Sequence, residues 1–161
     1  MMAKVVYAGS FDPITLGHVD VAERAQRLFG EVVVAVGRNS SKTYVFNYEE
    51  RIELVRGALQ HLDGVHVEPL SGLLVDFARQ HDAVAIVKGL RFGADFDFEL
   101  QQAHMNHSLT RIETVLLPAS KEYVTLSSTI LREVFRLGGD VSSYVPTNVA
   151  AAIRDKQAAL G

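Results

Sequence analysis

"AKVVYAGSFDPITLGHVDVAERAQRLFGEVVVAVG", residues 3–37, decides the fold class of this chain. Both of its ends, residues 3–8 and 31–37, are short apolar runs rich in valine, as is typical of strands that are buried on both faces. Between them, residues 17–29 carry apolar side chains at the spacing of a helix. A strand, a helix and another strand in this order predict a β-α-β unit, the repeating element of a parallel sheet.

The same alternation continues through the rest of the chain. Asn47, followed three residues later by Glu50, resembles a capping box that starts a helix. The pattern predicts further helices over residues 48–62, 72–82, 94–109, 127–139 and 146–160, and further strands over residues 65–69, 83–89 and 112–118. Since no linker or repeat interrupts this order, residues 1–161 are expected to form one domain with a doubly wound α/β fold around a five-stranded parallel sheet.

The composition narrows the functional classes. The chain has 161 residues, a net charge of −3 and no long basic block, so nucleic-acid binding has little electrostatic support. The absence of cysteine excludes disulfides, thiolate nucleophiles and cysteine-based metal sites. No apolar stretch approaches the roughly 20 residues that span a bilayer, and no signal-peptide pattern is present. We therefore expect a cytoplasmic protein that binds neither nucleic acid nor membrane.

Polar, basic and glycine-rich segments follow the predicted strands. They read "GSFDPITLGH" at residues 9–18, "GRNSSK" at 37–42, "SGLL" at 71–74, "KGLR" at 88–91 and "SKEYVTLSST" at 120–129. Because ligands of doubly wound sheets bind at the carboxyl ends of the strands, these segments are expected to meet at one site. Two of them open helices, and free amide groups at a helix N-terminus favour an anion. The cations Lys88 and Arg91 beside Gly89 suit a polyphosphate.

Each of these motifs also has a purely structural interpretation. Residues 9–18 are compatible with a tight strand-to-helix turn that ends in a solvated His18. Hydroxyl side chains at residues 127–129 are common helix caps, and Lys88 with Arg91 is compatible with a surface cluster. No P-loop, dinucleotide-binding fingerprint or hydrolase nucleophile elbow occurs. The convergence of all segments on one sheet edge is therefore the stronger signal.

The helix predicted from residue 94 raises two further questions. Its polar side chains fall on one stripe, which either faces solvent or lines the pocket because the helix follows "KGLR"; they are Asp95, Glu99, Gln102 and Asn106. His104 and His107 have a spacing found in metal pairs, but no third ligand is evident, so a structural interpretation is favoured.

Three segments together carry a family resemblance. "AGSFDPITLGHVDV" (residues 8–21), "AIVKGLRFGADFDFELQQAHMN" (85–106) and "SKEYVTLSSTILREVFRLGGDVSSYVP" (120–146) resemble the phosphopantetheine adenylyltransferase family of the nucleotidyltransferases, whose T/H-x-G-H signature falls on residues 15–18. The likeness covers nearly the whole chain and implies a Rossmann-like nucleotidyltransferase fold. It also implies transfer of AMP from ATP to 4′-phosphopantetheine, which yields dephospho-coenzyme A and pyrophosphate.

The resemblance assigns roles to particular residues. The pantetheine phosphate would attack the α-phosphorus of ATP directly, with His18, Lys42 and Arg91 as catalytic residues. A helix N-terminus disfavours imidazolium, so a neutral His18 would act on the α-phosphate, and Lys42 would bridge the two reacting phosphates. ATP would contact Ser10, Phe11, His18, Gly89, Leu90, Arg91, Glu99, Tyr123, Val124, Thr125, Leu126, Ser127, Ser128 and Thr129. The pantetheine substrate would contact Ser10, Lys42, Leu74, Lys88 and Asn106.

The family also suggests partners and alternatives. Mg²⁺ would be held mainly by the ATP phosphates and water rather than by protein ligands, the chain would form a homohexamer, and coenzyme A would be a feedback ligand of the same site. Ser10, Lys88 and Phe98 replace the commoner Thr, Arg and Tyr, which weakens the pantetheine-site assignment most at Lys88. The nearest alternatives are a nicotinamide-mononucleotide adenylyltransferase, a glycerol-phosphate cytidylyltransferase and a non-catalytic adenylate-binding module.

Overall fold

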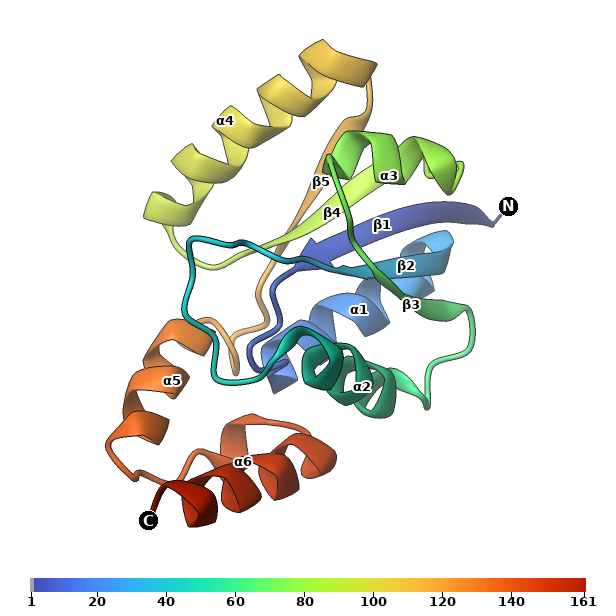
Figure 1. Ribbon diagram of the computed structural model, residues 1–161. Coiled ribbons are helices and arrows are strands. Elements are labelled where there is room, and N and C mark those ends of the chain that lie inside the picture. The colour runs from blue at the N-terminus through green and yellow to red at the C-terminus, as the bar shows by residue number, and fades with distance from the viewer. Residues whose placement is uncertain (1) are drawn as a thin grey trace.

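Five strands form a central sheet with helices on both faces (Figure 1). The computed structural model describes residues 2–161. Its strands are β1 (Ala3–Gly9), β2 (Gly30–Val36), β3 (Val65–Pro69), β4 (Ala85–Leu90) and β5 (Glu113–Pro118). They lie in the order β3-β2-β1-β4-β5, and every neighbouring pair is parallel, which confirms the predicted five-stranded parallel sheet.

The helices divide between the two faces of the sheet, as a doubly wound fold requires. Figure 1 shows α3 and α4 on one side of the strands and α1 and α2 on the other, with α5 and α6 beyond α2. Their bounds are α1 Leu16–Phe29, α2 Tyr48–Leu59, α3 Leu74–Gln80, α4 Gly93–Thr110, α5 Ser128–Arg136 and α6 Thr147–Leu160, with a 3₁₀ turn at Ser142–Tyr144 before α6. Within residues 2–161, every helix is too short or too polar to cross a bilayer.

Alternation along β1 divides the hydrophobic core in two. Val5 and Tyr7 pack into the larger core, which the sheet forms with α1, α2, α5 and α6. Val6 and Ala8 point the other way, into a smaller core under α3. Because successive side chains of a strand point to opposite faces, the apolar run needs a helical layer on each side. The register places Tyr7 opposite both Val34 of β2 and Val87 of β4, so the carboxyl ends of these three strands align.

The helix ends differ by a few residues from the sequence prediction. The capping box of α2 is confirmed, since the Asn47 side chain accepts the Glu50 N–H and the Glu50 carboxylate accepts the Asn47 N–H. The helix expected over residues 127–139 ends at Arg136, because the chain turns at Gly138 with a φ of +81°, a conformation that glycine adopts without strain. These shifts leave the segments that follow the strands where they were predicted.

Candidate active site

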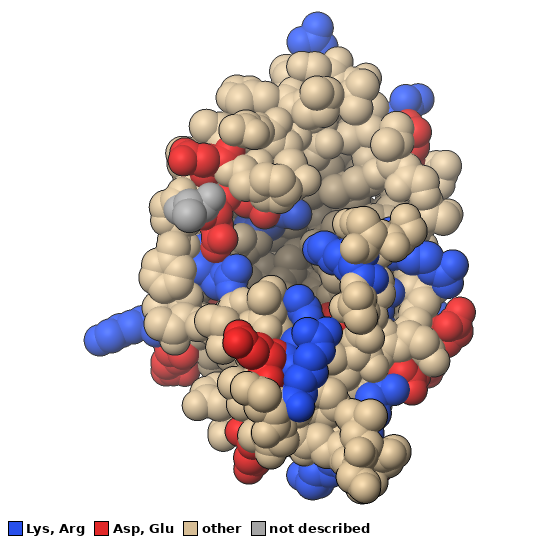
Figure 2. All heavy atoms as spheres, turned by 60° about the vertical axis from the view of Figure 1, so that its left-hand side comes forward, with Lys and Arg blue, Asp and Glu red and all other residues tan. Residues whose placement is uncertain are grey.

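A cavity of about 290 Å³ opens at the carboxyl ends of β1 and β4. β2 and β3 lie on one side of β1, whereas β4 and β5 lie on the other, so the strand order reverses between β1 and β4, and ligands of such sheets bind at that point. The cavity wall comes from the turn after β1, the start of α1, Lys42 of the loop after β2, the end of β4, Glu99 of α4 and the segment before α5. Figure 2 shows the hollow on the molecular surface with basic side chains around it.

Most residues that the sequence proposed for the site line this cavity. They are Ser10, Phe11, His18, Lys42, Lys88, Gly89, Arg91, Glu99, Tyr123, Leu126, Ser127, Ser128 and Thr129. Five others do not contribute to the wall: Leu74, Leu90, Asn106, Val124 and Thr125. Leu74 packs against the core under α3, and the "SGLL" segment as a whole lies outside the wall. The binding roles of these five residues remain predictions.

The cavity also contains residues that the sequence did not assign to the site. Tyr7, Asp12, Val21, Ala119 and Arg132 line it. The sequence could have indicated Arg132 as a site residue, because it lies one helical turn after Ser128 and therefore on the same face of α5. Tyr7 and Val21 carried none, because a strand tyrosine and a helix valine are typical core residues.

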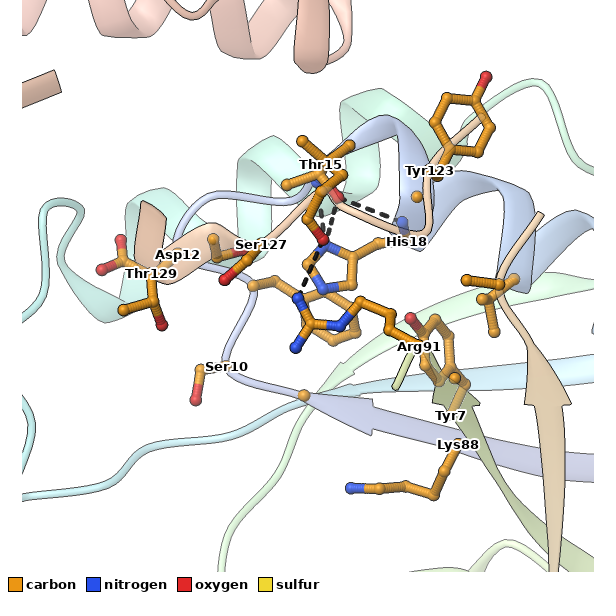
Figure 3. Close-up of a pocket in the computed structure, with 18 of the residues that line it drawn as sticks. Tyr7, Ser10, Asp12, Thr15, His18, Lys88, Arg91, Tyr123, Ser127 and Thr129 are labelled. Carbon is orange, nitrogen blue, oxygen red and sulfur yellow. Dashed lines mark hydrogen bonds between the residues drawn. The ribbon is translucent and has the colours of Figure 1, made fainter. Parts of the chain in front are cut away.

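Hydrogen bonds at the start of α1 fix the proton of His18. Thr15 is the N-cap, and its backbone N–H donates to His18 Nδ1 over 2.9 Å (Figure 3). A backbone N–H can only donate, so Nδ1 accepts and carries no proton in this arrangement. The remaining proton of the neutral ring is therefore on Nε2. His18 is thus both a helix-capping residue and an oriented N–H donor, but it is half-buried rather than solvated, so the structural interpretation holds only for the cap.

Two aromatic rings hold the imidazole in place. The Phe11 ring meets His18 edge to face at 5.1 Å between centroids, and Tyr7 meets Phe11 in the same way at 5.5 Å. Phe11 reaches this position through a left-handed backbone with φ of 50°. A Cβ on Gly9 would come within 3.1 Å of the Phe11 ring, so glycine leaves the space that the ring occupies. Gly9 therefore does more than shape the turn.

His18 is neutral at physiological pH. Burial, and secondarily the positive charge of Arg91, lower the pKa of His18 from 6.5 to about 4. The neutral state that the sequence predicted is thus supported, but its main cause is desolvation rather than the helix N-terminus. An imidazole that stays neutral can donate Nε2–H to an anion without changing its protonation state.

The titration of His18 is open to a direct test. We expect the His18 Cε1–H resonance of the free protein to titrate near pH 4, with the His18→Gln spectrum assigning the signal. Because this folded-state pKa lies below 6.5, the unfolded chain takes up a proton between about pH 6.5 and pH 4 while the folded chain does not. This group therefore destabilises the fold as the pH falls through that window. A midpoint near 6.5 would contradict the buried, neutral assignment.

Basic side chains dominate the cavity wall. Lys42, Lys88, Arg91 and Arg132 line it, against the two carboxylates of Asp12 and Glu99. Glu99 lies 3.4 Å from Lys88 Nζ, and Asp12 is buried and accepts the backbone N–H groups of the loop after β2. The cavity is therefore suited to an anion that carries several negative charges.

Arg91 connects two walls of the cavity. Its Nη1 donates to the Leu126 carbonyl over 3.0 Å, and its Nε pairs with Asp95 over 3.2 Å. Figure 3 shows Arg91 and His18 together on one side of the cavity. The polar stripe of α4 therefore faces the site at one end and solvent further along. Asp95 contacts Arg91 and Glu99 contacts Lys88, while Gln102 is exposed.

The N-terminus of α5 forms the opposite wall. Its N-cap residue Ser127 makes no side-chain capping bond, so simple capping does not explain this hydroxyl. Ser128 Oγ donates to the Pro13 carbonyl over 3.0 Å, and Arg132 Nη1 donates to the Asp12 carbonyl over 2.8 Å. These bonds hold the α5 N-terminus beside the turn after β1. Its unpaired amide groups are then available to phosphate oxygens.

The site offers no protein cage for a metal ion. Across residues 2–161, no three His, Asp or Glu side chains come together in a metal-binding arrangement. His107, one half of the spaced histidine pair, lies 3.5 Å from Glu113.

The fold and the site together define a nucleotidyltransferase, and comparisons with known proteins agree. The family model described as cytidylyltransferase-like matches residues 6–134. A bifunctional NMN adenylyltransferase/ADP ribose pyrophosphatase of Francisella tularensis superimposes with a TM-score of 0.69 at 18% identity, over 99% of this chain and 52% of that one. A putative nicotinate-nucleotide adenylyltransferase of Vibrio parahaemolyticus gives 0.69 at 20% identity, over 98% and 95%. These structures establish the shared fold.

Sequence similarity narrows the class further. A phosphopantetheine adenylyltransferase of Cutibacterium acnes is 50% identical over 153 residues, which cover 95% of this chain and 98% of that protein. The one of Actinobacillus pleuropneumoniae is 48% identical over 158 residues, which cover 98% and 100%. The chain belongs to the phosphopantetheine adenylyltransferase family.

Proposed function

We propose that this enzyme transfers AMP from ATP to 4′-phosphopantetheine and releases dephospho-coenzyme A and pyrophosphate. One observation supports the reaction type most. His18 accepts the Thr15 N–H at Nδ1 and so keeps its proton on Nε2, and it lines a cavity with four basic side chains. The identity of the acceptor rests on relatives that are about half identical over nearly the full chain.

The chemistry is a direct displacement between two phosphates. An oxygen of the acceptor phosphate attacks the α-phosphorus of ATP, and the bond from that phosphorus to the leaving pyrophosphate breaks. No protein nucleophile is needed, so the protein contributes position and charge. His18 Nε2–H donates to an α-phosphate oxygen, where negative charge is held in the transition state. Lys42 neutralises both reacting phosphates and lowers the repulsion between two anions.

The remaining cavity residues bind the substrates. The free amide groups at Ser127, Ser128 and Thr129 receive the β- and γ-phosphates at the α5 N-terminus. Arg91, fixed by Leu126 and Asp95, adds a cation between that end and His18. On the β4 side, Lys88 supplies a positive charge for the acceptor, oriented by Glu99. Leu74 and Asn106, outside the cavity wall, are assigned to the pantetheine arm by the family resemblance alone.

Mg²⁺ fits this site as an ion that enters bound to the phosphates of ATP. Of the two carboxylates in the wall, Asp12 is engaged by backbone N–H groups and Glu99 lies beside Lys88. Mg²⁺ commonly retains several waters and binds through substrate phosphates, so this donor set is sufficient. When bound, the ion neutralises charge on the triphosphate.

A panel of acceptors tests the proposed function. Pyrophosphate release from ATP is measured with 4′-phosphopantetheine, nicotinamide mononucleotide, nicotinate mononucleotide and glycerol 3-phosphate, and with CTP in place of ATP. We expect release only with ATP and 4′-phosphopantetheine, and only when Mg²⁺ is present. Turnover with a mononucleotide acceptor would refute the assignment, and ATP binding without turnover of any acceptor would favour a non-catalytic adenylate-binding module.

We also propose that the enzyme is a cytoplasmic homohexamer that coenzyme A inhibits at the same site. Support for self-association comes from α4, where Phe96, Phe98, Leu100, Met105 and Leu109 are exposed apolar side chains on one helix. Coenzyme A contains the reaction product with one further phosphate, so the cation-lined cavity suits it.

The proposed use of ATP and the cysteine-free chain support a location in the cytoplasm. Light scattering on the purified enzyme should give the mass of six chains. Coenzyme A should compete with ATP in a binding assay.

A further inference from the structure

A buried arginine lies behind the active site. Arg51, on α2, is only 1% exposed and is not part of the cavity wall. Its Nη1 donates to the Ser10 carbonyl over 2.6 Å and to the Gly37 carbonyl over 2.8 Å. Ser10 belongs to the turn after β1, and Gly37 begins the loop that carries Lys42. One guanidinium group therefore bridges two segments of the substrate site.

Stability alone gives a weak reason for this arginine. Among the ion pairs of residues 2–161 none involves Arg51, and its Nε is buried without a hydrogen-bond partner in that range. Burial lowers the pKa of Arg51, which reflects the cost of removing the charge from water. The Asp12 carboxylate acts on this charge without a direct ion pair, and apolar replacements of a buried charge are often at least as stable. The position of its two acceptors is the more informative feature.

Contacts of the guanidinium group extend to Lys42 itself. The group stacks on the Tyr44 ring at 4.0 Å. The Tyr44 hydroxyl oxygen accepts the Asn39 N–H over 2.8 Å, and the Asn39 carbonyl accepts the Lys42 N–H over 3.1 Å. A continuous series of contacts thus runs from Arg51 through Tyr44 and Asn39 to the backbone of the catalytic lysine.

The Lys42 loop is anchored at both ends to the turn after β1. At its start, Gly37 N–H donates to the Gly9 carbonyl over 2.8 Å, beside the Arg51 bridge. At its end, the Asp12 carboxylate accepts the N–H groups of Val45 and Phe46 over 2.8 and 2.9 Å. Between these anchors residues 38–43 are exposed. Arg38 contacts Glu49 and Tyr48 at the surface, and the Arg51–Tyr44 stack supports the loop from its buried side.

We propose that Arg51 is a positioning residue that sets the distance between the Ser10 and Lys42 segments across the reacting phosphates. The proposal rests on the proposed function, since Lys42 matters only if it bridges the two phosphates. Both carbonyls accept from the single Nη1, so an ammonium group at position 51 keeps the charge and a donor for them but lacks the planar group that stacks on the Tyr44 ring. The guanidinium shape is therefore what positions the loop.

The kinetic test is a double-mutant cycle between Arg51→Met and Lys42→Ala. On its own, Arg51→Met is expected to lower kcat roughly ten- to hundredfold, the scale of a misplaced catalytic group, with little change in KM for ATP. In the Lys42→Ala background the same substitution is expected to have little further effect, because the residue through which it acts is absent. Losses that multiply independently in the double variant would overturn the proposal.

A structural test needs no substrate. Trypsin cleaves after Lys42, and mass spectrometry quantifies that cut separately from all others. Arg51→Met is expected to accelerate cleavage after Lys42 at least tenfold relative to cuts elsewhere, because the loop loses its internal support. An unchanged rate of cleavage after Lys42 would overturn the proposal. Failure of the wild-type enzyme to use 4′-phosphopantetheine would refute the proposed function instead, and the cleavage rates could still be interpreted.

A matched control separates positioning from general destabilisation. Val55→Ala truncates a fully buried side chain of the larger core, one turn further along α2 than Arg51. Its melting temperature is to be compared with that of the Arg51 variants, and its kcat and its cleavage after Lys42 are expected to stay near wild type. If Arg51→Met does not fold, Arg51→Lys carries the same measurements. Equal kcat losses in Val55→Ala and the Arg51 variants would show that Arg51 is merely structural.

Discussion

Replacing His18 with alanine is expected to lower kcat by about a hundredfold or more, the scale of losing one transition-state donor, and to leave the affinity for ATP nearly unchanged. The reason lies in the orientation of the ring, since Thr15 occupies Nδ1 and leaves the proton on Nε2. In the proposed function this donor acts on charge at the α-phosphate, whereas Arg91 and the α5 N-terminus would hold most of the triphosphate. Stopped-flow pyrophosphate release and ATP binding by calorimetry give the two quantities.

Two variants sharpen the His18 prediction. His18→Gln places an amide N–H near the position of Nε2, so it should recover part of kcat. Thr15→Val removes the hydroxyl but keeps the backbone N–H that fixes the tautomer, so its kcat should remain within a few-fold of wild type. If His18→Ala has a normal kcat, or weakens ATP binding as much as it slows turnover, His18 is not the transition-state donor.

Replacing Lys42 with alanine is expected to have the second large effect, a loss of about a hundredfold or more in kcat/KM for the acceptor. Two phosphates repel each other as they approach, and a cation within about 4 Å of both offsets part of this repulsion. Lys42 is exposed on its loop, so its removal costs little stability. The measurement is steady-state kinetics with 4′-phosphopantetheine varied at saturating ATP.

The same loop provides a control of equal charge. Arg38 is exposed, pairs with Glu49 over 3.8 Å and lies outside the cavity wall. Arg38→Ala therefore changes the net charge as Lys42→Ala does but should retain kcat/KM. The Lys42 effect should also persist at high salt, where long-range attraction between exposed charges is screened. Equal losses in the two variants would indicate general electrostatic attraction rather than a bridge at the reacting phosphates.

The sheet and the location of the site were predictable from the sequence, because both follow from patterns that repeat. Valine-rich runs separated by amphipathic helices require parallel strands, and parallel strands bring their carboxyl ends to one edge. His18 and Arg91 therefore meet, although 72 positions lie between them in the sequence. The helix start predicted within residues 9–18 is also found, since Thr15 caps α1 and the His18 imidazole takes part in the same capping box.

The supporting residues were not predictable, because their environment depends on tertiary packing. Arg51 follows two glutamates near the start of a helix, a pattern typical of a solvated face, yet it is almost fully buried. Asp12 lies in a turn, where aspartate is common for local reasons, but its partners are Val45 and Phe46. The cause of the low pKa of His18 was also missed, since burial cannot be computed from a motif.

The bonds that join α5 to the turn after β1 bear on how the enzyme matures. Ser128 reaches Pro13 and Arg132 reaches Asp12, so contacts separated by 115 and 120 residues complete the triphosphate wall. The turn that carries His18 precedes α5 by more than 100 residues, so this wall of the cavity forms only after α5 has been synthesised and has docked. Such long-range closure is slow to form and is favoured by any ligand that spans it. A ligand that contacts both the first turn and α5, as proposed for ATP, would therefore stabilise the folded enzyme by joining the two ends of its chain.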